Sequence, residues 1–191
     1  MKVCIVSDSH DRADALAQAV REAKALGAQA VIHCGDLIGA QSLKPALAVG
    51  LPVHLIHGNN VGDAQALHKL ARASGDKLNY HGADAGIDLA GRRVFLAHYD
   101  DHGYAFACTG DWELVCCGHS HRAEVRQVMS VKGTPTWLVN PGTVAGLAAP
   151  STCRCPLPLD LRMLAKKYLA LPLWAMSYRV PAITASTIST R

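Results

Sequence analysis

Five times along the chain, a short apolar run of strand-forming residues ends directly in a motif rich in Asp, His and Asn. The apolar runs have the length of buried strands, and segments with helical periodicity separate several of them. Because the carboxyl ends of parallel strands meet at one edge of an α/β sheet, the five motifs are expected to converge on one site. The motifs are Asp8-Ser9-His10, Gly35-Asp36, Gly58-Asn59-Asn60, His98-Tyr99-Asp100 and Gly118-His119-Ser120-His121.

Strand-like and helical segments alternate in the first half of the chain, and strands dominate the second half. The sequence predicts strands over 2–7, 29–34, 52–57, 85–89, 92–97, 112–117, 123–131 and 135–139, and helices over 11–26, 41–49, 63–73 and 100–108. Ala90-Gly91 suits the turn of a hairpin between two of these strands. This order predicts an α/β fold in which helices cover a sheet on one or both faces.

The composition is that of a globular protein: 50% of the 191 residues are hydrophobic and 18% are charged. A net charge of +4 without any Lys/Arg-rich run gives no strong signal for nucleic acid. No apolar stretch is long enough to span a membrane, and the N-terminus reads as a strand rather than a secretory signal. The odd number of cysteines, seven, favours buried free thiols in a reducing compartment, so we predict a cytoplasmic protein.

Composition changes abruptly near residue 150. Residues 151–191 contain no Gly, four of the nine Pro and one acid, Asp160, against six basic residues, so they carry the whole positive balance. We therefore predict a compact domain over residues 1–150 and an atypical basic C-terminal tail over 151–191. The tail is either a native extension or the product of an altered reading frame.

Seven side chains in the five motifs are candidate metal ligands. Carboxylate, imidazole and amide oxygen together suit Mn, Fe, Co, Ni or Zn, whereas several imidazoles argue against Mg and Ca. Seven ligands are too many for one tetrahedral ion, but they fit two ions about 3.5–4 Å apart that share a carboxylate. The candidate ligands are Asp8, His10, Asp36, Asn59, His98, His119 and His121.

Each motif alone also has a simpler explanation. An isolated Asp-x-His is most often a turn with a surface histidine, and Gly-Asp and Gly-Asn are common turn dipeptides. All five motifs in order, each at the end of a strand, favour a metal centre instead. The other histidines are expected to be structural (His33, His54, His57) or to face solvent (His68, His81, His102).

With these motifs in order, the chain resembles the calcineurin-like metallophosphoesterases, in particular their small single-domain bacterial and archaeal phosphodiesterases. Asn140-Pro141-Gly142-Thr143 is similar to a turn that follows the motifs in that branch. The resemblance covers about residues 1–150 and implies a four-layer αββα sandwich with two metal ions at the C-terminal ends of its strands. It also implies the distribution of the ligands: one ion is held by Asp8, His10, Asp36 and His121, and the other by Asp36, Asn59, His98 and His119, with Asp36 bridging.

The activity that the resemblance implies is hydrolysis of a small phosphodiester or nucleotide-like substrate by a metal-bridging hydroxide. Manganese is the first choice of metal, with Ni, Fe, Co and Zn as alternatives. The residues expected to carry catalysis are Asp36, Asn59, Asn60 and His98, and Asn60 and Arg122 are candidate substrate contacts. Many relatives carry a proton-donating His where this chain has Asn60, and the small branch often reads His-Gly-His where this chain has His98-Tyr99-Asp100.

Other functions stay open at this point. The retromer scaffold subunit resembles the same fold but serves as a docking surface, and a metal sensor without turnover would use the same ligands. Among enzymes, a phosphomonoesterase or a hydrolase of dinucleoside polyphosphates is the nearest alternative. The sequence also leaves open the identity of the metal, the physiological substrate and whether the chain forms a homo-oligomer.

Overall fold

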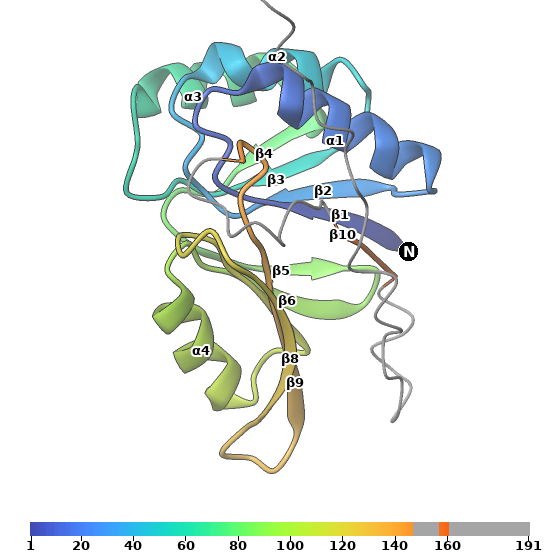
Figure 1. Cartoon of the computed structure of the whole chain (residues 1–191), viewed down its shortest axis with the longest axis vertical. Helices are drawn as coiled ribbons and strands as arrows, with labels where there is room; N and C mark the ends of the chain where they lie inside the picture. Colours follow the sequence, from blue (N-terminus) through green and yellow to red (C-terminus); the bar gives the residue numbers. More distant parts are fainter. Residues whose placement is uncertain (147–156, 161–191) are drawn as a thin grey trace, which may run out of the picture.

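In the computed structural model, residues 1–146 and 157–160 are described, and they form four layers (Figure 1). Helices α1, α2 and α3 cover one face of a first sheet, a second sheet packs on the opposite face, and α4 covers the far side of the second sheet (Figure 1). Three buried apolar clusters fill the three spaces between these layers. The predicted αββα sandwich is therefore confirmed.

The first sheet has the strand order β10-β1-β2-β3-β4. Its three parallel pairings join β1 to β2, β2 to β3 and β3 to β4, and β10 pairs antiparallel with β1 at the edge. Parallel pairing places the carboxyl ends of β1, β2 and β3 at one edge of the sheet, where the first three motifs follow. The strands are β1 (Lys2–Val6), β2 (Ala30–His33), β3 (Val53–Leu55), β4 (Leu78–Tyr80) and β10 (Leu157–Asp160).

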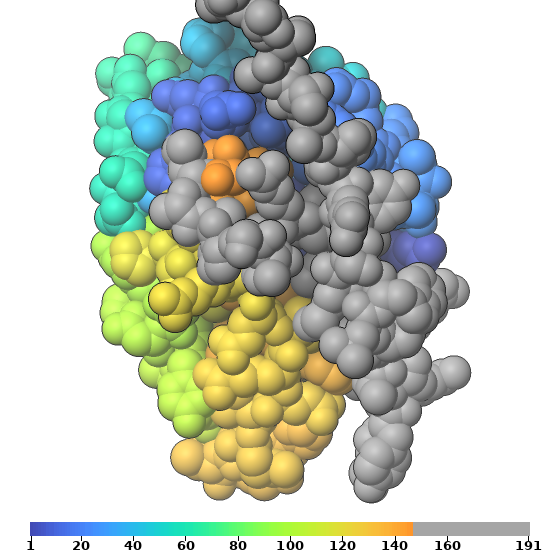
Figure 2. Space-filling view, viewed as in Figure 1, coloured from blue at the N-terminus to red at the C-terminus, as the bar shows by residue number. Residues whose placement is uncertain are grey.

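The second sheet has the order β5-β6-β7-β9-β8. Its parallel pairs, β6 with β7 and β7 with β9, bring the last two metal motifs to the edge where the first three lie. In the space-filling view, β8 (yellow), the edge strand of this sheet, lies on the lower front, and α3 (teal), which covers the first sheet, lies at the upper left (Figure 2). The strands are β5 (Ala85–Leu89), β6 (Arg92–Leu96), β7 (Leu114–Cys116), β8 (Ala123–Met129) and β9 (Pro135–Pro141).

The helices follow the periodicity of the sequence. Asp63 caps α3, because its side chain accepts a hydrogen bond from the amide of Ala66 at 2.8 Å. Gly27, two residues beyond α1, and Gly110, directly after α4, have positive φ angles. The helices are α1 (Ala13–Ala25), α2 (Ala40–Leu47), α3 (Ala64–Ser74) and α4 (Asp100–Thr109), and none in the described part of the chain is long and apolar enough to cross a membrane.

The structure contains two strands that the sequence did not predict. Strand β4 has three residues and follows the single 3₁₀ turn η1 (Gly75–Lys77), so it offers no alternation of apolar residues. Strand β10 comes from the predicted tail and pairs with β1 from Lys2 to Ile5. Most of the tail lies outside the described residues, so the boundary at residue 150 stays a prediction.

His54 on β3 and His81, directly after β4, form a hydrogen-bonded pair between these two neighbouring strands. Their Nδ1 and Nε2 atoms lie 3.1 Å apart, and the ring planes differ by 3°. Both side chains are half-buried, so the prediction of a solvent-facing His81 was wrong. If either histidine were replaced by an apolar residue, the ring nitrogen of the other would lose its hydrogen-bond partner.

Acid is expected to destabilise the protein through this pair. Burial, with a contribution from His81, lowers the pKa of His54 to about 4. In the unfolded state the pKa of histidine is about 6.5. Between this value and 4, only the unfolded state binds a proton at position 54, so stability falls as the pH falls from about 6.5 toward 4. In metal-free wild type, the unfolding free energy should fall between pH 7 and pH 5. His54→Gln should make this fall smaller by about 1–2 kcal/mol. Urea denaturation at both pH values measures this, with the exposed His68→Gln as control; equal losses in wild type and His54→Gln would contradict it.

Candidate metal centre

All seven predicted ligands come together where the strands of the two sheets end. Asp8 and His10 follow β1, Asp36 follows β2, and Asn59 follows β3. From the second sheet, His98 follows β6, and two further histidines follow β7. The two sheets thus contribute to one site from opposite sides.

The backbone of this site is held in conformations that side chains other than glycine rarely adopt. Seven described residues other than glycine have positive φ angles, and five of them are candidate ligands. Such conformations cost on the order of 1–3 kcal/mol each and persist at sites where the surrounding structure imposes them. The five are Asp8 (53°), His10 (40°), Asp36 (54°), His119 (67°) and His121 (58°).

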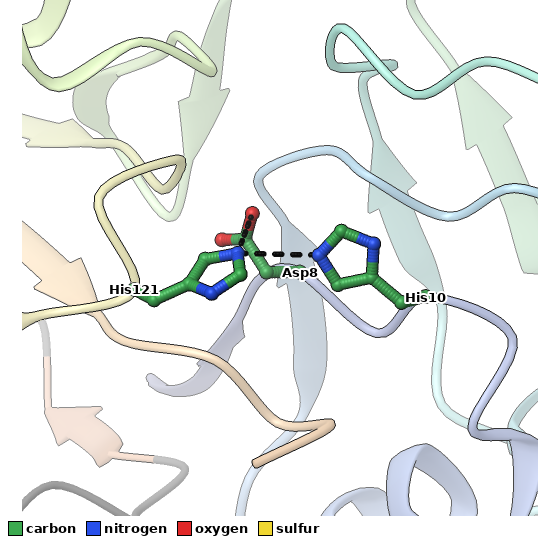
Figure 3. Close-up of side chains that lie close together, drawn as sticks. All are labelled: Asp8, His10 and His121. Carbon is green, nitrogen blue, oxygen red and sulfur yellow. Dashed lines mark hydrogen bonds and ion pairs between the residues drawn. The ribbon is translucent and has the colours of Figure 1, made fainter. Parts of the chain in front are cut away.

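Asp8, His10 and His121 form a first group of ligands (Figure 3). Nε2 of His10 and Nε2 of His121 lie 3.2 Å apart, and Nε2 of His121 lies 3.3 Å from Oδ1 of Asp8. Metal–nitrogen bonds of about 2.0–2.1 Å place two nitrogens of a shared ion about 3 Å apart. The three side chains point toward one another with the spacing of a common ion.

Asn59, His98 and His119 form a second group. Oδ1 of Asn59 lies 2.9 Å from both Nε2 of His98 and Nδ1 of His119. On its other side, Nδ1 of His98 lies 2.8 Å from the carbonyl oxygen of Cys34, which can only accept a hydrogen bond. The proton of the neutral ring therefore belongs on Nδ1, and the lone pair of Nε2 faces the group.

Asp36 lies between the two groups. Its Oδ2 is 3.7 Å from Nε2 of His10, and its Oδ1 is 3.3 Å from Nε2 of His98. Burial raises the pKa of Asp36, but two hydrogen bonds from Asn60 and the neighbouring histidines outweigh burial and leave this pKa below its usual value. The carboxylate is therefore ionised and faces a ligand of each group.

Asp8 is fully buried, and its Oδ1 has no hydrogen-bond partner among the described residues. Burial is the main cause that raises the pKa of Asp8, because the charged form loses water. A cation beside Oδ1 would compensate this loss. The orphaned oxygen, the converging nitrogens and the mixed carboxylate, imidazole and amide donors fit divalent transition-metal ions.

Three glycines allow the ligands to approach this closely. A Cβ atom on Gly58 would lie 2.2 Å from Oδ1 of Asp36 and 2.6 Å from the ring of His98. On Gly118 it would lie 2.0 Å from Oγ of Ser7, and on Gly35 2.5 Å from Nδ1 of His98. The glycines of the predicted motifs are therefore required by packing across the two sheets, which their sequence context alone did not show.

The turn at residues 140–143 supports two of the ligand loops. The side-chain amide of Asn140 is buried and donates to the carbonyl of Gly118 at 2.7 Å and to Oγ of Ser120 at 3.1 Å. The hydroxyl of Thr143 donates to the carbonyl of Asp8 at 2.8 Å. In the sequence this turn is recognisable only as a resemblance, whereas the structure gives it a positioning role.

Ser9 and His33 form a buried pair that sequence analysis missed, with Oγ and Nε2 3.0 Å apart. Nδ1 of His33 accepts from the amide of Gly35, so Nε2 carries the proton and donates to Ser9. Burial lowers the pKa of His33 to about 3, which keeps this ring neutral. Because His33 donates to the hydroxyl and both residues are buried, the pair is not an activated serine nucleophile.

The two predicted substrate contacts occupy different environments. Asn60 binds Asp36 twice: its amide N–H donates to Oδ1 at 2.9 Å and its side chain donates to Oδ2 at 2.6 Å. Arg122 is exposed and forms no ion pair within the part of the chain that the structure describes. Asn60 thus orients a candidate ligand, and Arg122 stays a predicted substrate contact.

The candidate ligands thus form two groups with Asp36 between them, and comparison with known proteins identifies the family. Residues 1–157 match the calcineurin-like phosphoesterase superfamily domain, so the chain belongs to this superfamily. A phosphodiesterase of Methanocaldococcus jannaschii is 23% identical over 148 residues, which are 76% of this chain and 86% of that protein.

Solved structures share the fold. An archaeal phosphodiesterase superposes with a TM-score of 0.69 at 21% identity, covering 78% of this chain and 87% of its own. A phosphoesterase of Escherichia coli gives a TM-score of 0.54 at 19% identity, covering 75% and 80%. Vps29 of Entamoeba histolytica, solved in complex with zinc, gives 0.53 at 16% identity, covering 81% of each chain.

Proposed function

We propose that this protein is a metal-dependent phosphodiesterase. The observation that carries the proposal is the placement of Asp36 between two ligand groups, with one oxygen toward His10 and the other toward His98. The similarity to the phosphodiesterase of Methanocaldococcus jannaschii supports a diester substrate. A small phosphodiester or nucleotide-like molecule is the substrate class we propose.

Two divalent ions, which we propose to be manganese, would supply the Lewis acidity that lowers the pKa of water toward neutrality and would offset charge on the phosphoryl group. Asp8, His10 and His121 would hold one ion, and Asn59, His98 and His119 the other, with Asp36 shared. Nickel, iron, cobalt and zinc suit the same donors.

The residues of the chain hold this site in one geometry. The carbonyl of Cys34 keeps the proton of His98 on Nδ1, so Nε2 keeps its lone pair. The amide groups of Asn60 fix both oxygens of Asp36. Asn60 has no proton to give to a departing alkoxide at reasonable cost, so a leaving group must stabilise its own charge.

One alternative function has support of its own. Vps29 shares the fold, which keeps a docking subunit without turnover as the second candidate function. Retention of all seven ligand side chains in converging positions favours turnover instead. Cys34, Cys108, Cys116 and Cys117 form no disulfide, and three of these four are buried, which supports a reducing location such as the cytoplasm.

The test is an assay of Mn-loaded protein against a series of substituted aryl diesters, cyclic nucleotides, dinucleoside polyphosphates and monoesters. We expect turnover of the diesters with a rate that falls steeply as the pKa of the leaving group rises, because the departing oxygen receives no proton. Addition of EDTA should abolish turnover, and Mn should restore it.

Each other outcome assigns a different function. Preferred turnover of monoesters or polyphosphates would replace the diester proposal, and tight metal binding without turnover of any substrate would favour the docking subunit or a sensor. A flat dependence on the leaving group would contradict the absence of a proton donor.

A further inference from the structure

Tyr99 belongs to the fourth motif, but it is neither a candidate ligand nor a hydrogen-bond partner of one. It lies between β6 and α4, where it directly precedes the first residue of the helix. Its ring centroid is 4.7 Å from that of His119 and 5.2 Å from that of His98, at interplanar angles of 63° and 68°. Tyr99 therefore stands edge-on against two ligands of the second group.

His102 continues this row of rings outward. Its centroid is 5.2 Å from that of Tyr99 at an angle of 65°, one turn along the start of α4. Tyr99 is half-buried and His102 is exposed, so the row His119, Tyr99, His102 leads from the ligand group to the surface. Each ring lies against its neighbour, which reduces the side-chain freedom that is lost when a planar group binds here.

The charge at this end of α4 restricts what can bind. Asp100 and Asp101 are both exposed in the first turn of α4. Oδ1 of Asp101 accepts from the amide of His102 at 2.8 Å, which holds one carboxylate beside the row. Two carboxylates disfavour a second phosphate at this position.

We propose that Tyr99 and His102 bind an uncharged aromatic substituent of the phosphoester, beside the ligand group of Asn59, His98 and His119. This inference rests on the proposed function and adds to it the substrate class: an ester with an aryl or nucleoside group, rather than a polyphosphate or a small alkyl ester. Aromatic pairs and base–aromatic stacking correspond to about a tenfold gain in affinity.

Binding of phosphonates to Mn-loaded protein by calorimetry tests the inference without requiring turnover. Phenylphosphonate and methylphosphonate carry the same charged group, so their ratio of dissociation constants isolates the aromatic contribution. We expect wild type to bind phenylphosphonate about tenfold more tightly, and 4-carboxyphenylphosphonate to lose most of this advantage. The double variant Asp100→Asn, Asp101→Asn should restore the tighter binding of 4-carboxyphenylphosphonate relative to methylphosphonate.

Three variants locate the effect. Tyr99→Leu should reduce the phenyl preference to about twofold or less, whereas Tyr99→Phe should keep it. Tyr104→Leu is the matched control, because Tyr104 is exposed on the same helix and packs against Arg126 at 5.0 Å. Manganese content is measured in each variant, because a Tyr99 that only positions His98 and His119 would change metal content and leave the ratio of the two phosphonates unchanged.

The inference is overturned if wild type binds both phosphonates equally, or if Tyr99→Leu keeps the preference. If Tyr99→Leu loses manganese, the exposed residue His102 provides the deciding variant. An unchanged phenyl preference in His102→Ala overturns the inference, and a decrease of this preference by at least about twofold supports it. Failure of the proposed function gives a different result, because a protein that turns over no ester can still show the phenyl preference.

Discussion

Asp36→Asn is expected to abolish turnover and to lower metal occupancy at both ion positions. Asp36 faces His10 with one oxygen and His98 with the other, so removing its charge weakens both groups at once. The substitution also conflicts with Asn60, which donates a hydrogen bond to each oxygen of the native carboxylate. An asparagine at position 36 would turn one acceptor into a donor that faces a donor. We expect kcat to fall on the order of 10³-fold or more.

Elemental analysis after purification and a steady-state assay measure the two effects together. The control is Asp76→Asn, which removes an exposed carboxylate in η1 far along the chain from every motif. It should keep two metal equivalents and normal activity. Two full equivalents of metal with normal activity in Asp36→Asn would rule out a shared carboxylate at this position.

The sequence was sufficient to predict the strand ends and the residues found there. The first three motifs follow strands that the structure pairs in parallel, and the last two follow β6 and β7, which also pair in parallel. Parallel pairing is what makes residues 8, 36, 59, 98 and 119 neighbours, although they are distant in the chain. Residue types at strand ends therefore carry most of the information about this site.

Contacts between distant segments could not be predicted in the same way. The tautomer of His98 depends on the carbonyl of Cys34, which lies 64 positions earlier in the sequence. The pairing of His54 with His81 depends on β4, whose three residues show no periodic pattern. Each of these features is a hydrogen bond fixed by the packing of the sheets, and no local pattern of residues encodes it.

Gly58→Ala is expected to disrupt the centre as strongly as the loss of a ligand, although it adds only a methyl group. A Cβ atom at this position would lie 2.2 Å from Oδ1 of Asp36, and 2.6 and 2.7 Å from Cε1 and Nε2 of His98. Both side chains are buried, so neither can move aside without leaving its ligand position. The backbone of Gly58 does not lie in the left-handed region, so the clash alone accounts for the effect.

The expected result is a loss of metal affinity of about 100-fold or more, since displaced partners of metal ligands alone cost 10–100-fold. Competition with a chelator measures the affinity, and circular dichroism establishes that the variant is folded. Gly133→Ala is a demanding control: its φ of 71° makes alanine unfavourable there, but a Cβ atom would meet nothing within 4 Å. It should cost about 1 kcal/mol of stability and leave metal affinity unchanged. If Gly58→Ala kept wild-type metal affinity, Asp36 and His98 could not both be ligands in the positions they occupy, because the added methyl group must displace at least one of them.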